Sequence, residues 1–429
     1  MPSKSMLSCL LGAALLAPAL PAVADGPAPA TIDYHGLRLT VPGHWRVVDL
    51  ERNPDTCLRL DLPTLYLGHA GTQAECTGRA VRTRADTLHL EPLDGAPPRA
   101  DIPTLRAEGP GGIPEPQGHS NEVRYALRRS GVMATVSYGT APDAVRDLLA
   151  RARTAGGAAA GAGGAPADPA SAVAGPKPVA GQEPFTGAGF DACTAPAQGA
   201  MDSWRAASPF GAVGIYIGGR ARACAQPQLT AGWVRQQAEA GWHLMPLWVG
   251  PQPWHNAVTG LSTDPSEANE QGKEAADGAA QAAGALGLAE GTVLYNDLEN
   301  YTDRTTWDPP VVAYLTAWTV RLHELGYRAA AYVAASSGAK ALSAHHDQAP
   351  WAMPDVLWAA SWNAEASVSD ADMGLPAGTH QWAGRRRAHQ YRGGHDDTYG
   401  GVTINIDRSW IDIDPAVLLS PARAEPAFG

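Results

Sequence analysis

The sequence VLYNDLEN, residues 293–300, decides how the C-terminal half of the chain is interpreted. Three apolar residues lead into Asp297 and Glu299, which are two positions apart. In a β-strand, residues two apart point to the same face and are about 6.5–7 Å apart along the chain. Two carboxylates on one face of an apolar strand repel each other and resist burial. The pair therefore calls for an explanation beyond ordinary strand structure.

Two interpretations of the pair are open. In the first, Asp297 caps a loop at the end of a strand and Glu299 is a solvated surface residue. In the second, the two side chains carry out acid–base chemistry, because cleavage of a glycosidic bond needs one protonated and one charged carboxyl group. The rest of the chain must decide between them.

Composition limits the classes of protein to consider. A chain of 429 residues is long enough for two or three domains, and 45% hydrophobic residues suffice for a large core. The net charge of −11 argues against a nucleic-acid partner, which needs clustered Lys and Arg. We interpret the short cluster Arg385, Arg386 and Arg387 as a solvated loop. Thirteen Trp against four Phe suits either stacking on sugar rings or core packing.

The N-terminus predicts a secretory signal at residues 1–24. Lys4 supplies the positive charge, residues 6–20 are apolar, and an A-x-A cleavage sequence precedes Asp25. No later segment reaches the roughly 18 uninterrupted apolar residues that a spanning helix needs. We therefore expect a secreted protein without a membrane span, extracellular or associated with the cell wall.

Cysteine usage agrees with export. Once Cys9 is removed with the signal, Cys57, Cys76, Cys193 and Cys224 remain. The simplest pairing joins Cys57 to Cys76 and Cys193 to Cys224, although four cysteines allow three connectivities. A zinc site is a weak alternative because close Cys and His spacing is absent from the sequence. We predict neither a metal site nor a cofactor.

An Ala, Gly and Pro-rich segment, residues 152–183, predicts a flexible linker. It separates a small β-rich domain at residues 25–151 from a larger domain at residues 184–419, which a tail at residues 420–429 follows. In the small domain, turn signals predict two hairpins, and a short amphipathic helix follows them. The hairpins pair residues 37–41 with 45–48 and residues 123–128 with 132–137. Residues typical of a catalytic site are absent from this domain, and its role stays open.

The larger domain alternates strand and helix patterns. This alternation predicts parallel βα units, and eight of them fit an α/β fold of the (β/α)8 TIM-like barrel type. An open doubly wound sheet is the alternative, weakened by the absence of a G-x-G-x-x-G sequence. Helices are expected at residues 230–240, 266–286 and 310–325. Strands are expected at residues 189–192, 213–217, 243–249, 293–298, 329–333, 356–361, 380–382 and 403–407.

Acidic residues close three of these strands. Asp191 ends the first strand, Asp297 and Glu299 end the fourth, and Asp407 ends the last. The first and last strands of a closed barrel are neighbours, so Asp191 and Asp407 should approach each other. Each acid alone is explained by loop capping, but barrel enzymes carry their chemistry at the carboxyl ends of the strands. Together, the four acids predict a shared site.

The motifs GFDAC at 189–193, IYIGG at 215–219, YNDLE at 295–299 and ID at 406–407 carry a resemblance. They resemble the glycoside-hydrolase-like barrel domain of secreted actinobacterial proteins, a domain of unknown function. The pattern is more distantly similar to lysozyme-type muramidases that use an Asp-x-Glu strand. The resemblance covers residues 185–413 and leaves out the N-terminal part.

This resemblance implies a role for each candidate site residue. Glu299 would be the general acid, and Asp297 would orient the reacting centre or position an N-acetyl group of the substrate. Asp191 and Asp407 would hold sugar hydroxyls or tune Glu299. Candidate sugar contacts, for each of which ordinary packing is the alternative, are Tyr216, Trp248, Trp362, Trp382, Gln390 and Tyr391.

Three hypotheses of function remain. In the first, the protein is a glycosidase that hydrolyses cell-wall or extracellular glycan, and the retention of all four acids favours it. In the second, the barrel is catalytically silent and only binds a polysaccharide or peptidoglycan-like glycan. In the third, suggested by the linker and the unassigned N-terminal domain, the chain is a protein-interaction scaffold. The sequence does not predict the oligomeric state.

Overall fold

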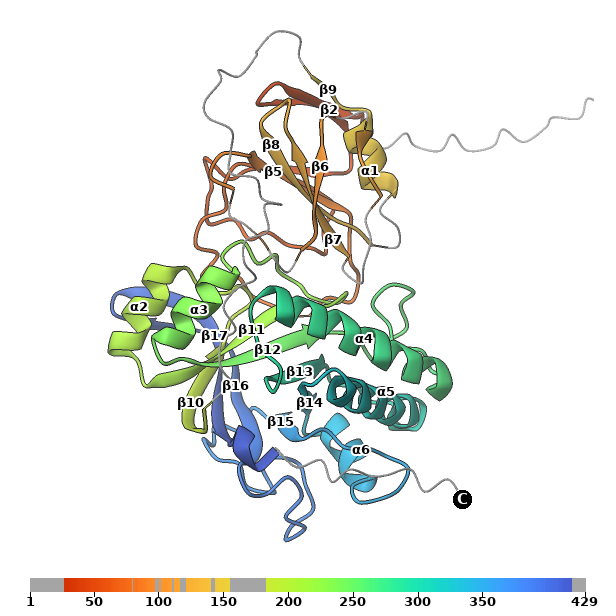
Figure 1. Cartoon of the computed structure of the whole chain (residues 1–429), viewed down its shortest axis with the longest axis vertical. Helices are drawn as coiled ribbons and strands as arrows, with labels where there is room; N and C mark the ends of the chain where they lie inside the picture. The colour runs from red at the N-terminus through yellow and green to blue at the C-terminus, as the bar shows by residue number, and fades with distance from the viewer. Residues whose placement is uncertain are drawn as a thin grey trace, which may run out of the picture.

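The computed structural model describes residues 27–418 with several gaps. The gaps are residues 79, 97–98, 100–101, 110–111, 116–120, 140–142 and 155–182. The predicted signal, almost all of the predicted linker and the predicted tail therefore lie outside the described residues. Figure 1 shows a β-rich N-terminal part above a larger α/β part.

The larger part is built on a closed barrel of eight strands, β10 to β17. Strands β10 to β16 run parallel to one another, whereas β17 pairs antiparallel with both β10 and β16. The predicted α/β barrel is thus confirmed as a closed eight-stranded barrel, but its last strand runs against the expected direction. The strands are β10 (Phe185–Asp191), β11 (Phe210–Gly218), β12 (His243–Val249), β13 (Val293–Leu298), β14 (Arg328–Ala334), β15 (Val356–Ala360), β16 (Arg386–Tyr399) and β17 (Val402–Ile413).

Helices join the first six barrel strands, and side-chain caps fix where several of them begin. The Asp264 carboxylate accepts the Ser266 amide at 2.7 Å, and Asp303 accepts the Thr306 amide at 3.1 Å. Because of the Asp303 cap, the helix expected at residue 310 begins at residue 304 and contains both Pro309 and Pro310. The helices are α2 (Gln198–Ala207), α3 (Ala231–Glu239), α4 (Pro265–Ala285), α5 (Arg304–Glu324) and α6 (Gly338–Ala344).

The two long helices, α4 and α5, lie side by side on the outside of the barrel (Figure 1). Gly272 of α4 permits this close approach, since a β-carbon there would lie 2.3 Å from the Tyr314 carbonyl oxygen of α5. Among the described residues, no helix combines the length and apolar character that crossing a membrane requires.

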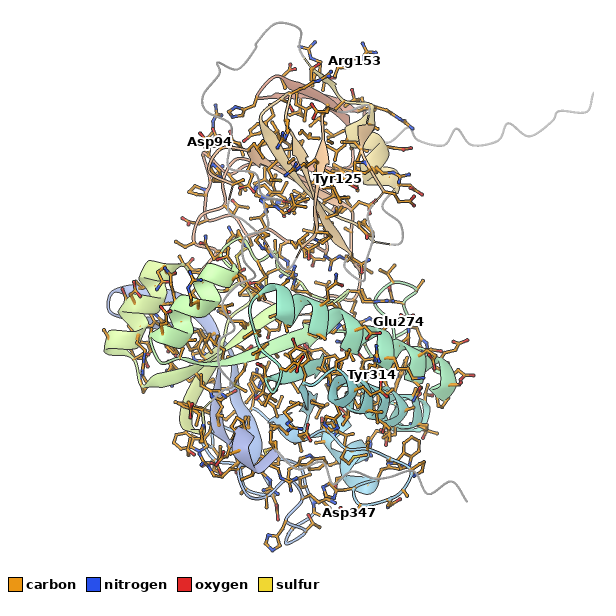
Figure 2. The ribbon with its side chains drawn as sticks, in the orientation of Figure 1. Asp94, Tyr125, Arg153, Glu274, Tyr314 and Asp347 are labelled. Carbon is orange, nitrogen blue, oxygen red and sulfur yellow. A yellow bond between two sulfur atoms is a disulfide. The ribbon has the colours of Figure 1, made fainter. Side chains whose placement is uncertain are left out.

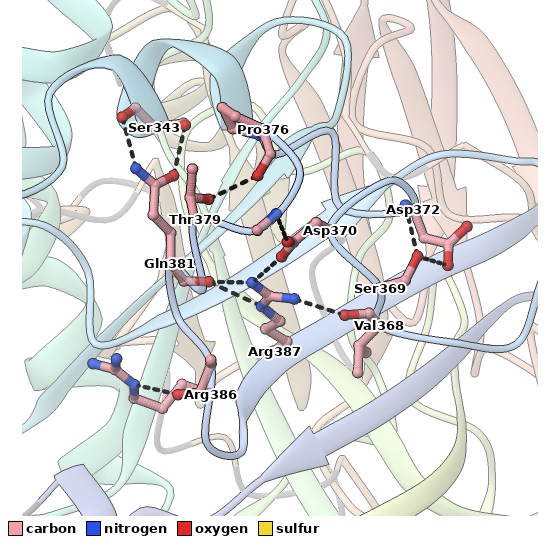
Figure 3. Close-up of polar contacts among 12 residues, drawn as sticks. Ser343, Val368, Ser369, Asp370, Asp372, Pro376, Thr379, Gln381, Arg386 and Arg387 are labelled. Carbon is pink, nitrogen blue, oxygen red and sulfur yellow. Dashed lines mark hydrogen bonds and ion pairs between the residues drawn. The ribbon is translucent and has the colours of Figure 1, made fainter.

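The connection from β15 to β16, residues 361–385, is fully described and contains neither helix nor strand. The expected strand at residues 380–382 is therefore wrong. The expected solvated loop at Arg385, Arg386 and Arg387 is also wrong, because Arg387 is buried in β16. Its guanidinium donates to the Asp370 carboxylate at 2.7 Å and to main-chain carbonyls of the connection, as Figure 3 shows. One charged side chain thus fixes a long segment without regular structure.

Alternation along each barrel strand separates an inner from an outer core. Val293 and Tyr295 of β13 belong to the cluster inside the barrel, whereas Leu294 and Leu298 pack toward the helices. Asp297 has the parity of Val293 and Tyr295, so its side chain belongs to the barrel interior. Glu299 follows with the same parity, directly after the strand ends.

The N-terminal part is β-rich, as predicted. Its six-stranded sheet has the order β3-β4-β5-β8-β7-β6, beside a three-stranded sheet of order β1-β2-β9. The predicted hairpin of β7 and β8 is confirmed. The predicted hairpin of residues 37–41 with 45–48 is wrong, because β2 pairs with β1, and β3 pairs in parallel with β4. The elements are β1 (Ala30–Tyr34), β2 (Leu37–Val41), β3 (Arg46–Asp49), β4 (Thr64–Leu67), β5 (Thr87–Pro92), β6 (Thr104–Ala107), β7 (Glu122–Leu127), β8 (Val132–Ser137), α1 (Asp143–Ala150) and β9 (Arg153–Thr154).

Two disulfides, Cys57–Cys76 and Cys193–Cys224, confirm the predicted pairing. The first lies in the N-terminal part, and the second joins the loops that follow β10 and β11. All four cysteines pack in one small cluster with Val81 and Ala223. The disulfides therefore stiffen the region where the two parts meet.

The N-terminal part contacts the loop that follows β11, at the carboxyl end of the parallel strands. Main-chain hydrogen bonds cross the boundary, among them Val81 N to Ala221 O at 2.8 Å and Ala225 N to Leu58 O at 3.0 Å. A buried ionic cluster lies beside them. Glu122 of β7 accepts from Arg222 of the barrel loop and lies 3.2 Å from Arg84 of the N-terminal part.

Opposing effects act on the buried Glu122. Burial disfavours its charged form, but the guanidinium groups of Arg222 and Arg84 outweigh burial and hold the pKa of Glu122 below its ordinary value. A carboxyl with a lowered pKa stabilises the fold above its unfolded pKa, and this stabilisation is lost as pH falls through the folded value.

We predict that Glu122→Ala lowers the free energy of unfolding by about 3–5 kcal/mol, because it leaves two buried guanidinium groups without their counter-charge. Urea unfolding at pH 7, followed by circular dichroism, measures the change. The matched control is Asp33→Ala, which removes a carboxylate from an exposed ion pair with Arg38 and should leave the midpoint in place. Equal effects of the two substitutions would contradict the importance assigned to the buried cluster.

Candidate active site

Asp191 and Asp407 face each other across neighbouring strands. The antiparallel register of β10 and β17 pairs them directly, which sets their α-carbons about 4.5–5.5 Å apart. Asp191 is fully buried and Asp407 is 6% exposed. The sequence predicts Asp407 at the end of the last strand, but Asp407 lies within β17. It reaches the carboxyl end of the barrel because β17 runs antiparallel. Gly214 makes room for Asp191, since a β-carbon there would lie 2.7 Å from the Asp191 β-carbon.

Hydrogen-bond donors surround this aspartate pair. The Gln390 side-chain amide donates to Asp191 at 3.0 Å and to Asp407 at 3.4 Å. The Tyr216 hydroxyl donates to the other Asp191 oxygen at 2.8 Å, and the Gly394 amide donates to Asp407. Donors shared between the two carboxylates offset their mutual repulsion and the cost of their burial.

Asp297 and Glu299 lie at the end of β13. Asp297 is fully buried, whereas Glu299 is half-buried. Gln252, a fully buried residue of the loop after β12, holds the main chain of both. Its side-chain carbonyl accepts the Glu299 amide at 2.7 Å, and its side-chain NH2 donates to the Asp297 carbonyl at 2.7 Å. Gln252 thus fixes the backbone that carries both acids.

Tyr332 of β14 links the two halves of the site. Its hydroxyl donates to the Gln390 side-chain carbonyl at 2.9 Å. Burial raises the pKa of Tyr332 well above its ordinary value, and the charges of four carboxylates raise it further. The four candidate acids, Asp191, Asp297, Glu299 and Asp407, therefore all lie near enough to this buried phenol to influence its pKa.

Trp362 is an exposed aromatic side chain beside this cluster. The residue is 68% exposed, and its indole NH donates to the Gln390 side-chain carbonyl at 3.0 Å. Its ring packs against Gly393, where a β-carbon would lie 2.1 Å from the ring. The hydrogen bond and this contact hold a large aromatic surface toward solvent beside the acids.

Two other tryptophans that the sequence had placed at the site lie elsewhere. Trp248 is 6% exposed and packs in the outer core, because its parity on β12 is opposite to that of the interior residues Leu247 and Val249. Trp382 is 1% exposed, and its indole NH donates to the Pro354 carbonyl at 2.7 Å, which is at the amino end of β15. Both fill the core, so the expected sugar-stacking role does not fit their positions.

The outer face of β13 is anchored to a helix. The Asn296 side chain donates to the Tyr314 hydroxyl of α5 at 2.7 Å. Tyr314, labelled in Figure 2, is buried, and burial raises its pKa above the ordinary value. Asn296 lies between Tyr295 and Asp297, so this bond fixes the strand immediately before the acids.

Sequence interpretation missed Tyr332, Gln252 and Gly394. Tyr332 lies in a correctly predicted strand, and a large polar aromatic at the carboxyl end of a barrel strand was a usable signal. Gln252 lies in an irregular loop and meets Asp297 and Glu299 only through the fold, so local sequence carries no sign of it. Tyr391 is a neighbour of Gln390 on β16, and its pKa is raised chiefly by burial.

Residues 202–411 match a family model described as the Rv2525c-like, glycoside hydrolase-like domain. The match confirms the resemblance to a glycoside-hydrolase-like family that the motifs had predicted. No curated protein matches the sequence.

Several solved structures are similar to about half of this chain. An uncharacterized B. stearothermophilus protein is 18% identical with a TM-score of 0.33, over 52% of this chain and 95% of that one. The Tat-secreted protein Rv2525c of Mycobacterium tuberculosis, solved with L-tartrate, is 13% identical with a TM-score of 0.36, over 53% and 96%. The modular autolysin LytC of Streptococcus pneumoniae is 11% identical with a TM-score of 0.34, over 52% and 46%.

We predict that Gln390→Glu lowers the melting temperature most at neutral pH. The substitution replaces a donor shared by Asp191 and Asp407 with a further buried carboxyl, whose pKa the neighbouring charges would raise. A raised folded pKa gives stability that is present below the unfolded pKa and lost as pH rises. The deficit relative to wild type should therefore shrink from pH 7 to pH 4 in calorimetric melting.

The matched control is Gln381→Glu, because the Gln381 side chain bonds Ser343 of α6 rather than Asp191 or Asp407 (Figure 3). Its deficit should change less over the same pH range. A Gln390→Glu deficit that stays constant or grows toward pH 4 would refute the electrostatic account.

Proposed function

We propose that this protein hydrolyses glycosidic bonds of a cell-wall or extracellular glycan, with Glu299 as the general acid. The observation that carries the proposal is the presence of four carboxylates at the carboxyl end of the barrel strands, where Asp191 pairs with Asp407 and where Asp297 and Glu299 close β13. The match of residues 202–411 to a glycoside hydrolase-like family supports the same chemistry. Barrel enzymes hold their catalytic groups at this end.

Glu299 is the acid best placed to meet a substrate. It is half-buried, whereas Asp191 and Asp297 are fully buried. A general acid must come within hydrogen-bond distance of the oxygen that it protonates, and partial burial near other carboxylates favours its protonated form. Glu299 combines access to solvent with such surroundings.

The remaining acids have supporting roles in this proposal. Asp297 is two positions before Glu299, so both side chains point to the same face. In this proposal, Asp297 stabilises positive charge at the reacting carbon or positions an N-acetyl group for attack. Asp191 and Asp407 already accept hydrogen bonds from Gln390, Tyr216 and Gly394. They therefore set the electrostatic surroundings of Glu299, with Tyr332 between them and β13.

Trp362 provides the surface on which a sugar ring would stack. Its indole ring is exposed and fixed, and aromatic rings pair well with the apolar faces of sugars. The hydrogen bond to Gln390 ties this surface to the residue that holds Asp191 and Asp407. Binding and chemistry would thus share one polar network.

We infer that the protein is exported, which would bring it to where such glycans occur. Two disulfides are typical of proteins that mature in an oxidising compartment. The predicted signal at residues 1–24 agrees with this. We therefore place the protein outside the cell, and the proposed hydrolysis uses water as its only co-reactant.

A second candidate function is glycan binding without catalysis. The observation that favours it is the near-complete burial of Asp191, Asp297 and Asp407, which leaves Glu299 as the most accessible acid of the four. A barrel that only binds glycan would still use Trp362, but it would not depend on the protonation of Glu299. The two functions are thus separable by substitution.

We predict that Glu299→Gln lowers the release of soluble glycan from bacterial cell walls and a polysaccharide panel at least about 100-fold, because the amide cannot deliver the proton. Reducing-end formation by the purified full chain measures release. The matched control is Glu290→Gln, which alters an exposed glutamate before the same strand, at the opposite end of the barrel. Release that survives Glu299→Gln would exclude Glu299 as the acid, and wall binding without release by wild type would favour the silent barrel.

We predict that Trp362→Ala weakens glycan binding about two- to tenfold, the range expected for losing one aromatic contact. Wall pull-down and KM for a soluble glycan report the change. The control is Trp351→Ala, because Trp351 packs edge-on against His345 at the amino end of the barrel. Equal binding by wild type and Trp362→Ala would show that sugars do not stack on this ring.

A further inference from the structure

The loop that follows β12, residues 250–262, carries Gln252 and is held from within. The Gln252 amide donates to the Thr259 carbonyl at 2.7 Å, and the Leu261 amide donates to the Gln252 carbonyl at 2.7 Å. The Trp254 indole NH donates to the Thr259 hydroxyl at 2.9 Å. Both Gln252 and Thr259 are fully buried. The loop is thus a compact unit in which Thr259 and Gln252 move together.

The N-terminal part holds this loop at the same residue. The Thr259 hydroxyl donates to the main-chain carbonyl of Arg82, and the Arg82 guanidinium lies 5.1 Å from the centre of the Trp254 ring. Arg82 directly follows Val81, whose amide donates to Ala221 of the neighbouring barrel loop. A hydrogen bond and a cation–π contact therefore connect one residue of the N-terminal part to this loop.

These contacts connect the N-terminal part to the main chain of Asp297 and Glu299. From Arg82 it passes through Thr259 to Gln252, and Gln252 holds the Asp297 carbonyl and the Glu299 amide. A donor and an acceptor on one side chain fix two points of the backbone that carries Glu299. Removing the support of Gln252 would let this backbone move by the fraction of an ångström that acid catalysis does not tolerate.

We propose that the N-terminal part positions Glu299, through Arg82, Thr259 and Gln252. Thr259 is a positioning residue, and the N-terminal part is a component of the site rather than a separate binding module on a tether. The N-terminal part thereby has a role in the site, and the effect of this role on turnover rests on the proposed function. The position of the Glu299 backbone does not depend on the proposed function and is measured separately.

The test follows hydrogen–deuterium exchange of the Glu299 amide, whose protection comes from the Gln252 side chain. In the full chain, Thr259→Val removes the hydroxyl with little change of shape. We expect exchange at Glu299 to accelerate about fivefold or more, the effect of losing one buried hydrogen bond. Thr259→Ser keeps the hydroxyl and should restore wild-type exchange.

A matched control removes a different bond between the same two parts. The Gln228 side-chain NH2 donates to the Gly71 carbonyl at 3.3 Å, away from residues 250–262. Gln228→Met should leave Glu299 exchange unchanged. If Thr259→Val fails to fold, Arg82→Gln tests the cation–π contact with the same readout and should accelerate exchange at Glu299.

The outcomes separate this proposal from the proposed function. Unchanged Glu299 exchange in the folded Thr259→Val or Arg82→Gln protein overturns the positioning role, and so does an equal effect of Gln228→Met. If wild type releases glycan, Thr259→Val should lower kcat with KM retained, and Thr259→Ser should restore kcat. If wild type releases none, the proposed function fails, while the exchange result still decides whether the N-terminal part positions Glu299.

Discussion

The carboxyl end of the barrel depends on keeping four carboxylates together in a poorly solvated place. Isolated buried carboxylates are costly, and neighbouring ones repel, and the fold supplies Asp191 and Asp407 with hydrogen-bond donors that offset this cost. Gln390 is central because its amide serves Asp191 and Asp407, while its carbonyl accepts from Tyr332 and Trp362. A single side chain therefore relates the acids to the buried phenol and to the exposed indole.

The direction of β17 makes this arrangement possible. An eighth parallel strand would bring only its last residues to the carboxyl end, whereas the antiparallel β17 starts at the hairpin with β16 and then passes Asp407 alongside Asp191. The connection that precedes β16 returns to the amino end of the barrel without a helix, because β16 runs parallel to β15. Arg387 stabilises that return by binding the connection at several points, so a structural cation supports the geometry of distant acids.

Local patterns in the sequence predict the barrel strands that alternate with helices. From these strands follows the prediction that one end of the barrel carries Asp191, Asp297, Glu299 and Asp407. These patterns are set by residues near in sequence, as are the disulfide pairs. The direction of β17 and the contact of Gln252 with β13 were not predictable, because they depend on which distant segments pair. Trp248 is different: alternation with Leu247 and Val249 already pointed its side chain outward, so parity would have excluded it from the barrel interior.

The buried charged side chains between the two parts limit the directions from which a long glycan would reach the site. Arg84, Arg222 and Glu122 are almost fully buried where the parts meet, and separating the parts would break that cluster at a large cost. The N-terminal part therefore stays over the loops that follow β11 and β12. Trp362 follows β15, which lies four strands from β11 and hence across the eight-stranded barrel. A polymer would approach from the side of Trp362, where an exposed ring meets it before the acids do, and the N-terminal part would close the opposite side.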